Sequence, residues 1–289
     1  VNLVGCSKSS NTIQAKEQAA AEGDAEAQLE IALAYANGQG VGQSDAKALV
    51  WFKKAAEQRN GKAAFHVGLA HKLGHGTPQN PGQAMYWFRK AAKLGDAEAE
   101  FNIGLAYAAG QGAEQDDSIA VNWYQKAAQK GIAEAQYNLG LAYANGKGIY
   151  QDNAQAVSWF YQAAEKGIVE AQYNLGLAYK MGLGIAKDEA EAVVWFEKAA
   201  KQGHIQAQFN LGLAYELGQG VTKDTKKALD WFQKAAEQGD AGAQYIMGAA
   251  YANGQGVNKD ETQAVYWFRK AADQGETGAI FNLAMAYEK

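Results

Sequence analysis

The chain has 289 residues, of which 48% are hydrophobic and 20% are charged, and its formal net charge is −4. This composition supports a packed core and excludes a disordered polyelectrolyte. The lack of a basic excess argues against nucleic acid as a partner. The single cysteine excludes an internal disulfide, and no run of residues approaches the roughly 20 apolar residues of a membrane span.

The first residues predict a leader followed by a capping helix. Residues 1–8 are expected to be a disordered leader, and Leu3-Val4-Gly5-Cys6 within it resembles the bacterial lipobox, whose cysteine is lipidated. On this interpretation Cys6 is a lipidation site, and an incidental cysteine is the alternative. Residues 9–24 form the expected helix, with small and polar residues on the face that is apolar in later helices, as in the caps of repeat proteins.

Seven tryptophans then follow at a constant interval of 36 residues, which only a tandem repeat explains. With tryptophan as position zero, an aromatic residue stands at +1 and +14, alanines stand at +4 and +5, and Gly-x-Gly closes most copies. The tryptophans are Trp51, Trp87, Trp123, Trp159, Trp195, Trp231 and Trp267.

Each copy is expected to be a hairpin of two helices. Apolar residues at −3, −2, 0, +1, +4 and +5 follow the helical period and define helix A. Seven residues before each tryptophan stands a side chain suited to an N-cap, and Pro81 fits the first helical position after Asn80. A second apolar stripe from +12 to +20 defines helix B, which the Gly-x-Gly turn ends. The predicted N-caps are Ser44, Asn80, Asp116, Asp152, Asp188, Asp224 and Asp260.

The repeat resembles a known family. Residues 133–167, AEAQYNLGLAYANGKGIYQDNAQAVSWFYQAAEKG, are similar to the Sel1-like repeat, a relative of the tetratricopeptide repeat. In that family's phase the chain holds seven repeats over 25–276 and a half repeat over 277–289. The repeat boundaries are 25–60, 61–96, 97–132, 133–168, 169–204, 205–240 and 241–276.

The resemblance implies an all-α fold, an α-solenoid in which antiparallel helix pairs stack into a right-handed superhelix. It also implies a protein-binding adaptor without a cofactor, in a bacterial envelope, secretion, signalling or host-interaction setting. Some family members have disulfide-linked repeats and are discussed as β-lactam-binding or weakly hydrolysing proteins. This chain lacks the paired cysteines, so that function is the less favoured alternative.

We expect the binding surface for a partner at the repeat positions whose residues are not fixed by packing. Positions −1 and +2 vary from copy to copy, and they share one face of helix A, the helix that normally lines the concave side of such stacks. Tyrosine and arginine are favoured as anchors. The predicted binding residues are Tyr86, Arg89, Asn122, Gln125, Ser158, Tyr161, Glu197, Asp230, Tyr266 and Arg269; an inert variable surface is the alternative.

Candidate catalytic and metal-binding groups are better explained by the repeat. Ser44 and Lys47 match Ser-x-x-Lys, but no partner motif follows and Ser44 occupies the N-cap column. His66, His71 and His75 cluster in one copy, yet His71 and His75 do not share a helical face, so we expect no metal site, with zinc as the alternative. His204 is expected to be structural. The chain is therefore predicted to be non-enzymatic.

The last half repeat leaves core-type residues such as Phe281 and Leu283 without a following helix. Either the natural chain continues or another molecule covers this face, so a monomer is expected unless the C-terminal face pairs. Assembly by stacking through that face is the alternative function. The expected location is the bacterial periplasm or the outer membrane, with contact to a membrane only through the lipid anchor; a secreted or cytoplasmic protein is the alternative.

Overall fold

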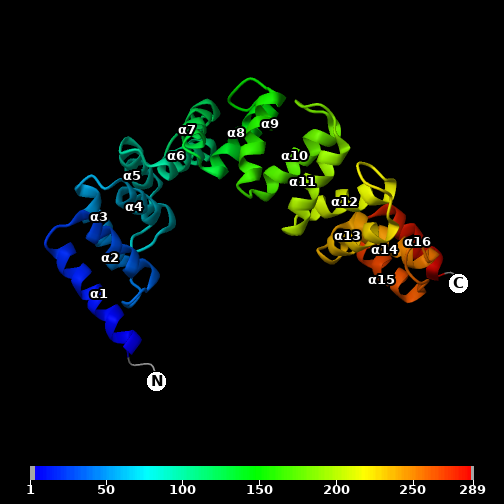
Figure 1. Cartoon of the computed structure of the whole chain (residues 1–289), viewed down its shortest axis with the longest axis horizontal. Helices are drawn as coiled ribbons and strands as arrows, with labels where there is room; N and C mark the ends of the chain where they lie inside the picture. The colour runs from blue at the N-terminus through cyan, green and yellow to red at the C-terminus, as the bar shows by residue number, and fades with distance from the viewer. Residues whose placement is uncertain (1–3, 288–289) are drawn as a thin grey trace. The chain divides into compact units, whose positions relative to one another are not determined.

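The computed structural model describes the backbone of residues 4–287 and the side chains of residues 13–285, and within these limits it contains helices and no strand. The chain divides into two compact units, residues 1–151 and 152–289. Within each unit, consecutive helices pack as neighbours (Figure 1). No described helix is both long and apolar enough to cross a membrane.

The helices of each unit alternate between helix B, with an even number from α2 onwards, and helix A, with an odd number from α3 onwards. The first unit contains α1 (Val4–Ala21), α2 (Ala25–Asn37), α3 (Asp45–Glu57), α4 (Gly61–Leu73), α5 (Pro81–Lys93), α6 (Ala97–Ala109), α7 (Asp117–Gln129) and α8 (Ala133–Asn145). The second contains α9 (Asn153–Glu165), α10 (Val169–Met181), α11 (Glu189–Lys201), α12 (Ile205–Leu217), α13 (Thr225–Glu237), α14 (Ala241–Asn253), α15 (Glu261–Ala272) and α16 (Thr277–Tyr287). The helix α1 starts at Val4, ahead of the capping helix expected over 9–24.

Side-chain caps fix where helix A begins. All seven predicted N-cap residues accept a hydrogen bond from a backbone N–H of the first turn, for example Asp116 from Ile119 at 2.9 Å. Helix B ends at the first glycine of Gly-x-Gly, which has left-handed φ, as Gly146 does at 65°. The second glycine lies against the backbone of the preceding helix A, so a Cβ at Gly148 would collide with the carbonyl of Asp117. These two glycines therefore set the tight connection between the helices.

The core of each hairpin is made by alanines and one aromatic ring. The +4 alanine is fully buried in every copy, and the +1 ring is at most 7% exposed. The +17 glycine lets this ring approach, since a Cβ on Gly176 would stand 2.7 Å from the Phe196 ring. The prediction that a small residue at +17 permits close helix packing is confirmed.

The tryptophans at position zero of the apolar stripe are buried to different depths. Trp195 and Trp267 are buried, at 4% and 6% exposure, but the other five are only half-buried. Position zero of the apolar stripe is therefore not fully buried in every copy. In six copies the +3 lysine lies over the ring: Lys54 Nζ is 4.2 Å from the centre of the half-buried Trp51 ring, and Lys198 Nζ is 3.6 Å from the centre of the buried Trp195 ring.

A row of buried glutamines links successive hairpins. The +13 glutamine donates to the backbone of the preceding helix A, as Gln208 Nε2 does to Ala200 O at 3.1 Å. Its own Oε1 accepts from the glutamine 30 positions later, as from Gln238 Nε2 at 2.8 Å. Three further pairs repeat this second bond: Gln58 with Gln28, Gln202 with Gln172, and Gln274 with Gln244.

Candidate functional site

The predicted binding residues lie on the solvent-exposed side of helix A. Nine of the ten are exposed and Glu197 is half-buried. They are Tyr86 and Arg89 on α5, Asn122 and Gln125 on α7, Ser158 and Tyr161 on α9, Glu197 on α11, Asp230 on α13, and Tyr266 and Arg269 on α15. The geometry shows a row of accessible side chains in each unit, and whether a partner uses it stays a prediction.

The tyrosines of this row are held by neighbouring tryptophans. Tyr161 packs edge-on against Trp195, with ring centres 5.7 Å apart. Tyr86 and Tyr266 contact the tryptophan that follows each of them in the same way, at 5.4 Å and 5.0 Å. These exposed rings therefore have limited freedom, and a partner would lose little conformational entropy in ordering them.

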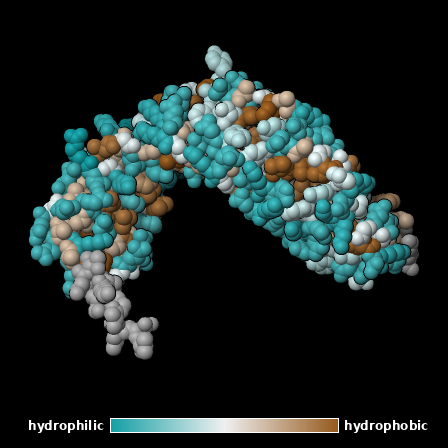
Figure 2. Space-filling view, in the orientation of Figure 1, coloured by the Kyte–Doolittle hydropathy of each residue, from teal (hydrophilic) through white to brown (hydrophobic). Residues whose placement is uncertain are grey.

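Some polar members of the row are also restrained within the protein. An Nη of Arg89 donates to the Tyr107 hydroxyl at 2.7 Å, and Glu197 forms an ion pair with Lys201 at 2.8 Å. Asn122 Nδ2 donates to the carbonyl of Ser118 at 3.0 Å. On the face shown in Figure 2, apolar residues form patches separated by hydrophilic ones. A partner would therefore meet a mixed surface.

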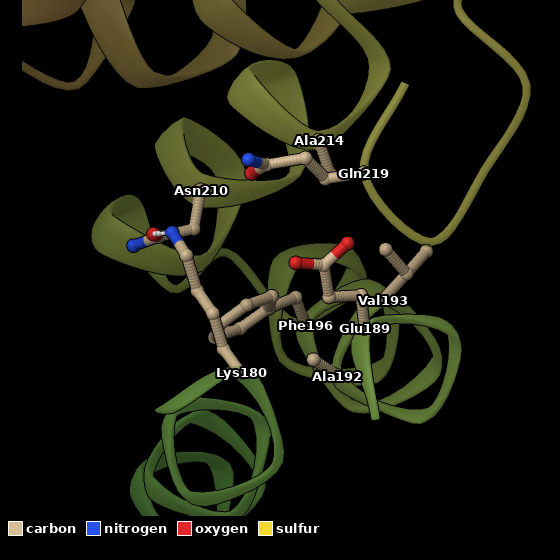
Figure 3. A pocket seen from close by; sticks show the side chains of 8 residues that line it. All are labelled: Lys180, Glu189, Ala192, Val193, Phe196, Asn210, Ala214 and Gln219. Atoms are coloured by element: carbon tan, nitrogen blue, oxygen red, sulfur yellow. Dashed lines mark hydrogen bonds between the residues drawn. The ribbon is translucent and has the colours of Figure 1, made fainter. Parts of the chain in front are cut away.

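Sequence reasoning missed a second feature, a cavity between the last turn of one helix B, the following helix A and the next helix B. Figure 3 shows the one beside Lys180, whose side chain runs along Phe196 and whose Nζ donates to Asn210 Oδ1 at 2.9 Å. Lys72 makes the same bond to Asn102 Oδ1 at 2.8 Å. Burial lowers the pKa of Lys72.

The residue at +21 decides how much space this cavity has. Where a lysine fills it, the cavity volume is about 10 Å³ at Lys180 and about 50 Å³ at Lys72. Where alanine stands there, the volume is about 230 Å³ at Ala108 and about 490 Å³ at Ala252. A signal was present in the sequence, since column +21 alternates among alanine, lysine and glutamate.

His66 and His204 have neighbours that explain them structurally, whereas the buried His71 Nδ1 has no hydrogen-bond partner. His66 stacks on Phe52 at 4.7 Å, and His204 caps α12 by accepting from Ala207 N at 3.2 Å. Burial is the main cause that lowers the pKa of His66, His71 and His204. Within the part of the chain that the structure describes, no three His, Cys, Asp or Glu side chains are grouped as a metal site would need.

Two other candidates were weighed in the sequence. Ser44 Oγ accepts from Lys47 N at 3.4 Å, which is the N-cap arrangement. Cys6 lies in the backbone range of α1, but its side chain is outside the described residues, so its lipidation stays a prediction.

Stacked hairpins with variable outer columns define this protein as an α-solenoid of helical repeats. The model of the Sel1 repeat matches residues 25–60, 61–96, 97–132, 133–168, 169–204, 205–240 and 241–276. The chain belongs to the Sel1 repeat family, and the predicted resemblance and fold class are confirmed.

Solved structures agree with this assignment. A protective antigen present in uropathogenic Escherichia coli strains, which displays an SLR fold, is 35% identical with a TM-score of 0.92 over 96% of this chain. This chain spans only 59% of that antigen's length. A Sel1 repeat protein from Oxalobacter formigenes is 36% identical with a TM-score of 0.72, over 94% of this chain and 79% of that one. No functionally curated protein matches the chain.

Sel1 repeat proteins generally mediate protein–protein interaction and are generally non-enzymatic.

Proposed function

We propose that this protein is a non-enzymatic scaffold that binds a partner protein or peptide on its concave face, which helix A lines, in a bacterial envelope, secretion, signalling or host-interaction setting. The observation that carries the proposal is the row of exposed tyrosines braced by tryptophans. Tyr86 is 56% exposed, and Tyr161 and Tyr266 are each 47% exposed. Large rings that are exposed yet restrained are suited to be interface anchors, because they bury much area at low entropic cost.

The test is capture of partners from the native cell extract by the full chain and by a triple variant, Tyr86→Ala, Arg89→Ala and Tyr161→Ala. Tyr150 provides a matched control, because it is 96% exposed in a loop outside the row. We expect the triple variant to lose specific partners in quantitative mass spectrometry, whereas Tyr150→Ala keeps them. Equal capture by all three proteins would refute the assignment of this surface.

The proposed location is the periplasm or the outer membrane, with Cys6 as the site of a lipid anchor. The motif Leu3-Val4-Gly5-Cys6 supports this proposal. Metabolic labelling of the full-length protein with a fatty-acid analogue tests it, with Cys6→Ser as the control. Labelling that is absent, or that persists in Cys6→Ser, would remove the anchor from the proposal.

A second function, assembly through α16, rests on a different observation. Phe281 is 67% exposed, and Ile280 and Met285 are 49% and 45% exposed on the same helix. Apolar side chains grouped in this way are typical of contact surfaces. Sedimentation velocity over a wide range of concentration tests this function: association that Phe281→Asp abolishes supports it, and a concentration-independent monomer refutes it.

A further inference from the structure

The cavity between α6, α7 and α8 has the same lining as a cavity that holds one of the protein's own lysines. Eight lining residues of the Lys180 cavity have counterparts 72 residues earlier, among them Glu189 with Asp117, Phe196 with Tyr124, and Asn210 with Asn138. The main difference is that Ala108 takes the place of Lys180. The Lys180 side chain in Figure 3 therefore shows what the empty space beside Ala108 would hold.

The acceptor at the end of this space is available. Asn102 and Asn210 each accept from a lysine Nζ through Oδ1. Asn138 Nδ2 donates to the carbonyl of Glu134 at 2.9 Å, as in the other copies, but Ala108 offers its Oδ1 no ammonium group. The volume of about 230 Å³ beside Ala108 lies between this oxygen and the apolar side chains of Val121 and Leu141.

Two further oxygens line the same cavity. Asp117 contributes a carboxylate, and Tyr124 brings a hydroxyl where Phe196 has none. Burial, with the nearby Asp117 carboxylate, raises the pKa of Tyr124 to about 12, so this group is a neutral hydroxyl. An ammonium group has three N–H donors, and the cavity offers it an amide oxygen, a hydroxyl and a carboxylate.

The cavity already has one cation, Lys147, which pairs with Asp117 at 3.2 Å. In the filled cavities the position of Lys147 is a glutamine, Gln219 beside Lys180 and Gln111 beside Lys72, so an entering ammonium group would share the Asp117 carboxylate with Lys147. One carboxylate and two ammonium groups would then be present beside Ala108, against one of each beside Lys180. At Lys72 the lysine is held even with Pro81 in place of the carboxylate.

From these observations we infer that the cavity beside Ala108 is a binding site for a lysine side chain of a partner protein. The alkyl chain lies on the apolar wall of α7, and the ammonium group donates to Asn138 Oδ1. The inference relies on the proposed scaffold function only for the source of the lysine. The cavity beside Ala252 differs, because Tyr245 and Met285 also line it.

The test uses two small probes with the ¹⁵N-labelled full chain. Nα-acetyl-lysine N-methylamide carries the ammonium group, and Nα-acetyl-norleucine N-methylamide has the same chain without it. We expect the lysine probe to shift the Asn138 side-chain amide resonances saturably and the norleucine probe to bind at least about tenfold more weakly, the loss expected for one charged hydrogen bond. Equal binding of both probes, or no saturable shift, would overturn the inference.

Two variants make the test specific. Ala108→Lys is expected to fill the cavity and abolish the shift at Asn138, and it introduces a residue that two other copies already accommodate. Lys72→Ala is expected to create a new lysine-binding response at Asn102, where the wild type has none. A response that survives in Ala108→Lys, or no gain in Lys72→Ala, would show that the acceptor does not define the site.

This experiment separates the inference from the proposed scaffold function. The triple variant Tyr86→Ala, Arg89→Ala and Tyr161→Ala leaves the cavity lining intact, so the lysine probe should bind it with unchanged affinity. Loss of partner capture with retained probe binding would support both conclusions independently. Retained capture with no probe binding would refute the lysine site together with the assignment of the tyrosine row.

Discussion

One link between hairpins buries a carboxylate where five other links have a glutamine amide, and this allows a specific test of the packing. Glu100 takes the place of the +13 glutamine and is 6% exposed. Its Oε1 accepts from Lys130 Nζ at 2.9 Å, but its Oε2 is buried without a hydrogen-bond partner. In five other copies the atom at this position is an amide Nε2 that donates to a carbonyl eight residues earlier; the equivalent carbonyl here is that of Ala92.

We therefore expect Glu100→Gln to stabilise the fold. The new Nε2 donates to Ala92 O and removes a buried unpaired acceptor, a defect that costs about 1–3 kcal/mol. Lys130 stays in place, since Nζ also donates to Gly95 O at 3.1 Å and the introduced glutamine would still present an Oε1 to it. The ion pair that is lost has a lysine with 40% of its side chain exposed, so it contributes less than about 1 kcal/mol. The net gain is about 1 kcal/mol in the free energy of unfolding.

Equilibrium urea unfolding followed by circular dichroism measures this change, and hydrogen exchange of the α6 amides reports whether it is local. The matched control is Gln172→Glu, which creates the same unpaired oxygen opposite a neutral partner, Gln202, and is expected to cost about 2–3 kcal/mol. A Glu100→Gln protein that is less stable than the wild type would refute the reasoning, because the ion pair would then outweigh the missing donor.

Three other changes test separate features. Arg59 has φ of 67° where the other six copies have glycine, so Arg59→Gly should raise the free energy of unfolding by about 1 kcal/mol, and an unchanged urea midpoint would contradict this. Gly176→Ala should cost about 1–3 kcal/mol because the new Cβ meets the Phe196 ring, whereas Gly82→Ala on the open side of α5 should stabilise by about 0.5–1 kcal/mol; the same sign for both would be a refutation. Burial lowers the pKa of His66 in the folded state, against the opposing effect of the Asp96 carboxylate. The free energy of unfolding should therefore be full above pH of about 6.5 and fall as the pH drops towards the folded pKa, by at most about 1.4 kcal/mol per pH unit. His66→Asn should flatten this part of a urea-unfolding pH series, and an unaltered profile would contradict the prediction.

Much of the fold follows from local rules that the sequence displays. The N-caps, the left-handed glycines and the apolar stripes each depend on residues within a few positions of one another, and the 36-residue period repeats them seven times. Depth of burial does not follow in this way. The period marks Trp51 and Phe52 as equally regular, but only the structure shows that Lys54 covers the tryptophan, 4.2 Å from the ring centre, while the phenylalanine is buried.

The cavities could not be predicted from the local sequence pattern for a related reason. Each is lined by three helices, and its key contact joins a residue at the end of one helix B to an asparagine 30 positions later, as Lys72 to Asn102. Neither residue is unusual in its own helix. A sequence comparison of copies shows that position +21 varies, but it does not show which side chain the variation leaves without a partner.

Some repeat positions contact each other across neighbouring hairpins. Comparing the residues at two such positions separates sequence variation that packing explains from variation that it does not. At columns +7 and +13, four copies pair glutamine with glutamine, another pairs Lys130 with Glu100, and another has the apolar residues Leu94 and Ala64. In these six pairs a change at one position is matched at the other, so this variation maintains the fold; in the seventh pair Lys166 stands against an unchanged Gln136.

Ala108 is different, because it removes the donor from Asn138 while the asparagine, the apolar wall and the carboxylate of the cavity all remain. The Asn138 side chain therefore presents an acceptor oxygen without the lysine donor that other copies supply. A site for a donor from a partner protein requires such an acceptor. The same criterion, a group without a partner inside the protein, orders the exposed residues of helix A as candidate anchors. Arg89 already donates to the Tyr107 hydroxyl. Tyr86 and Tyr161 each pack against a tryptophan on one side and remain exposed on the other.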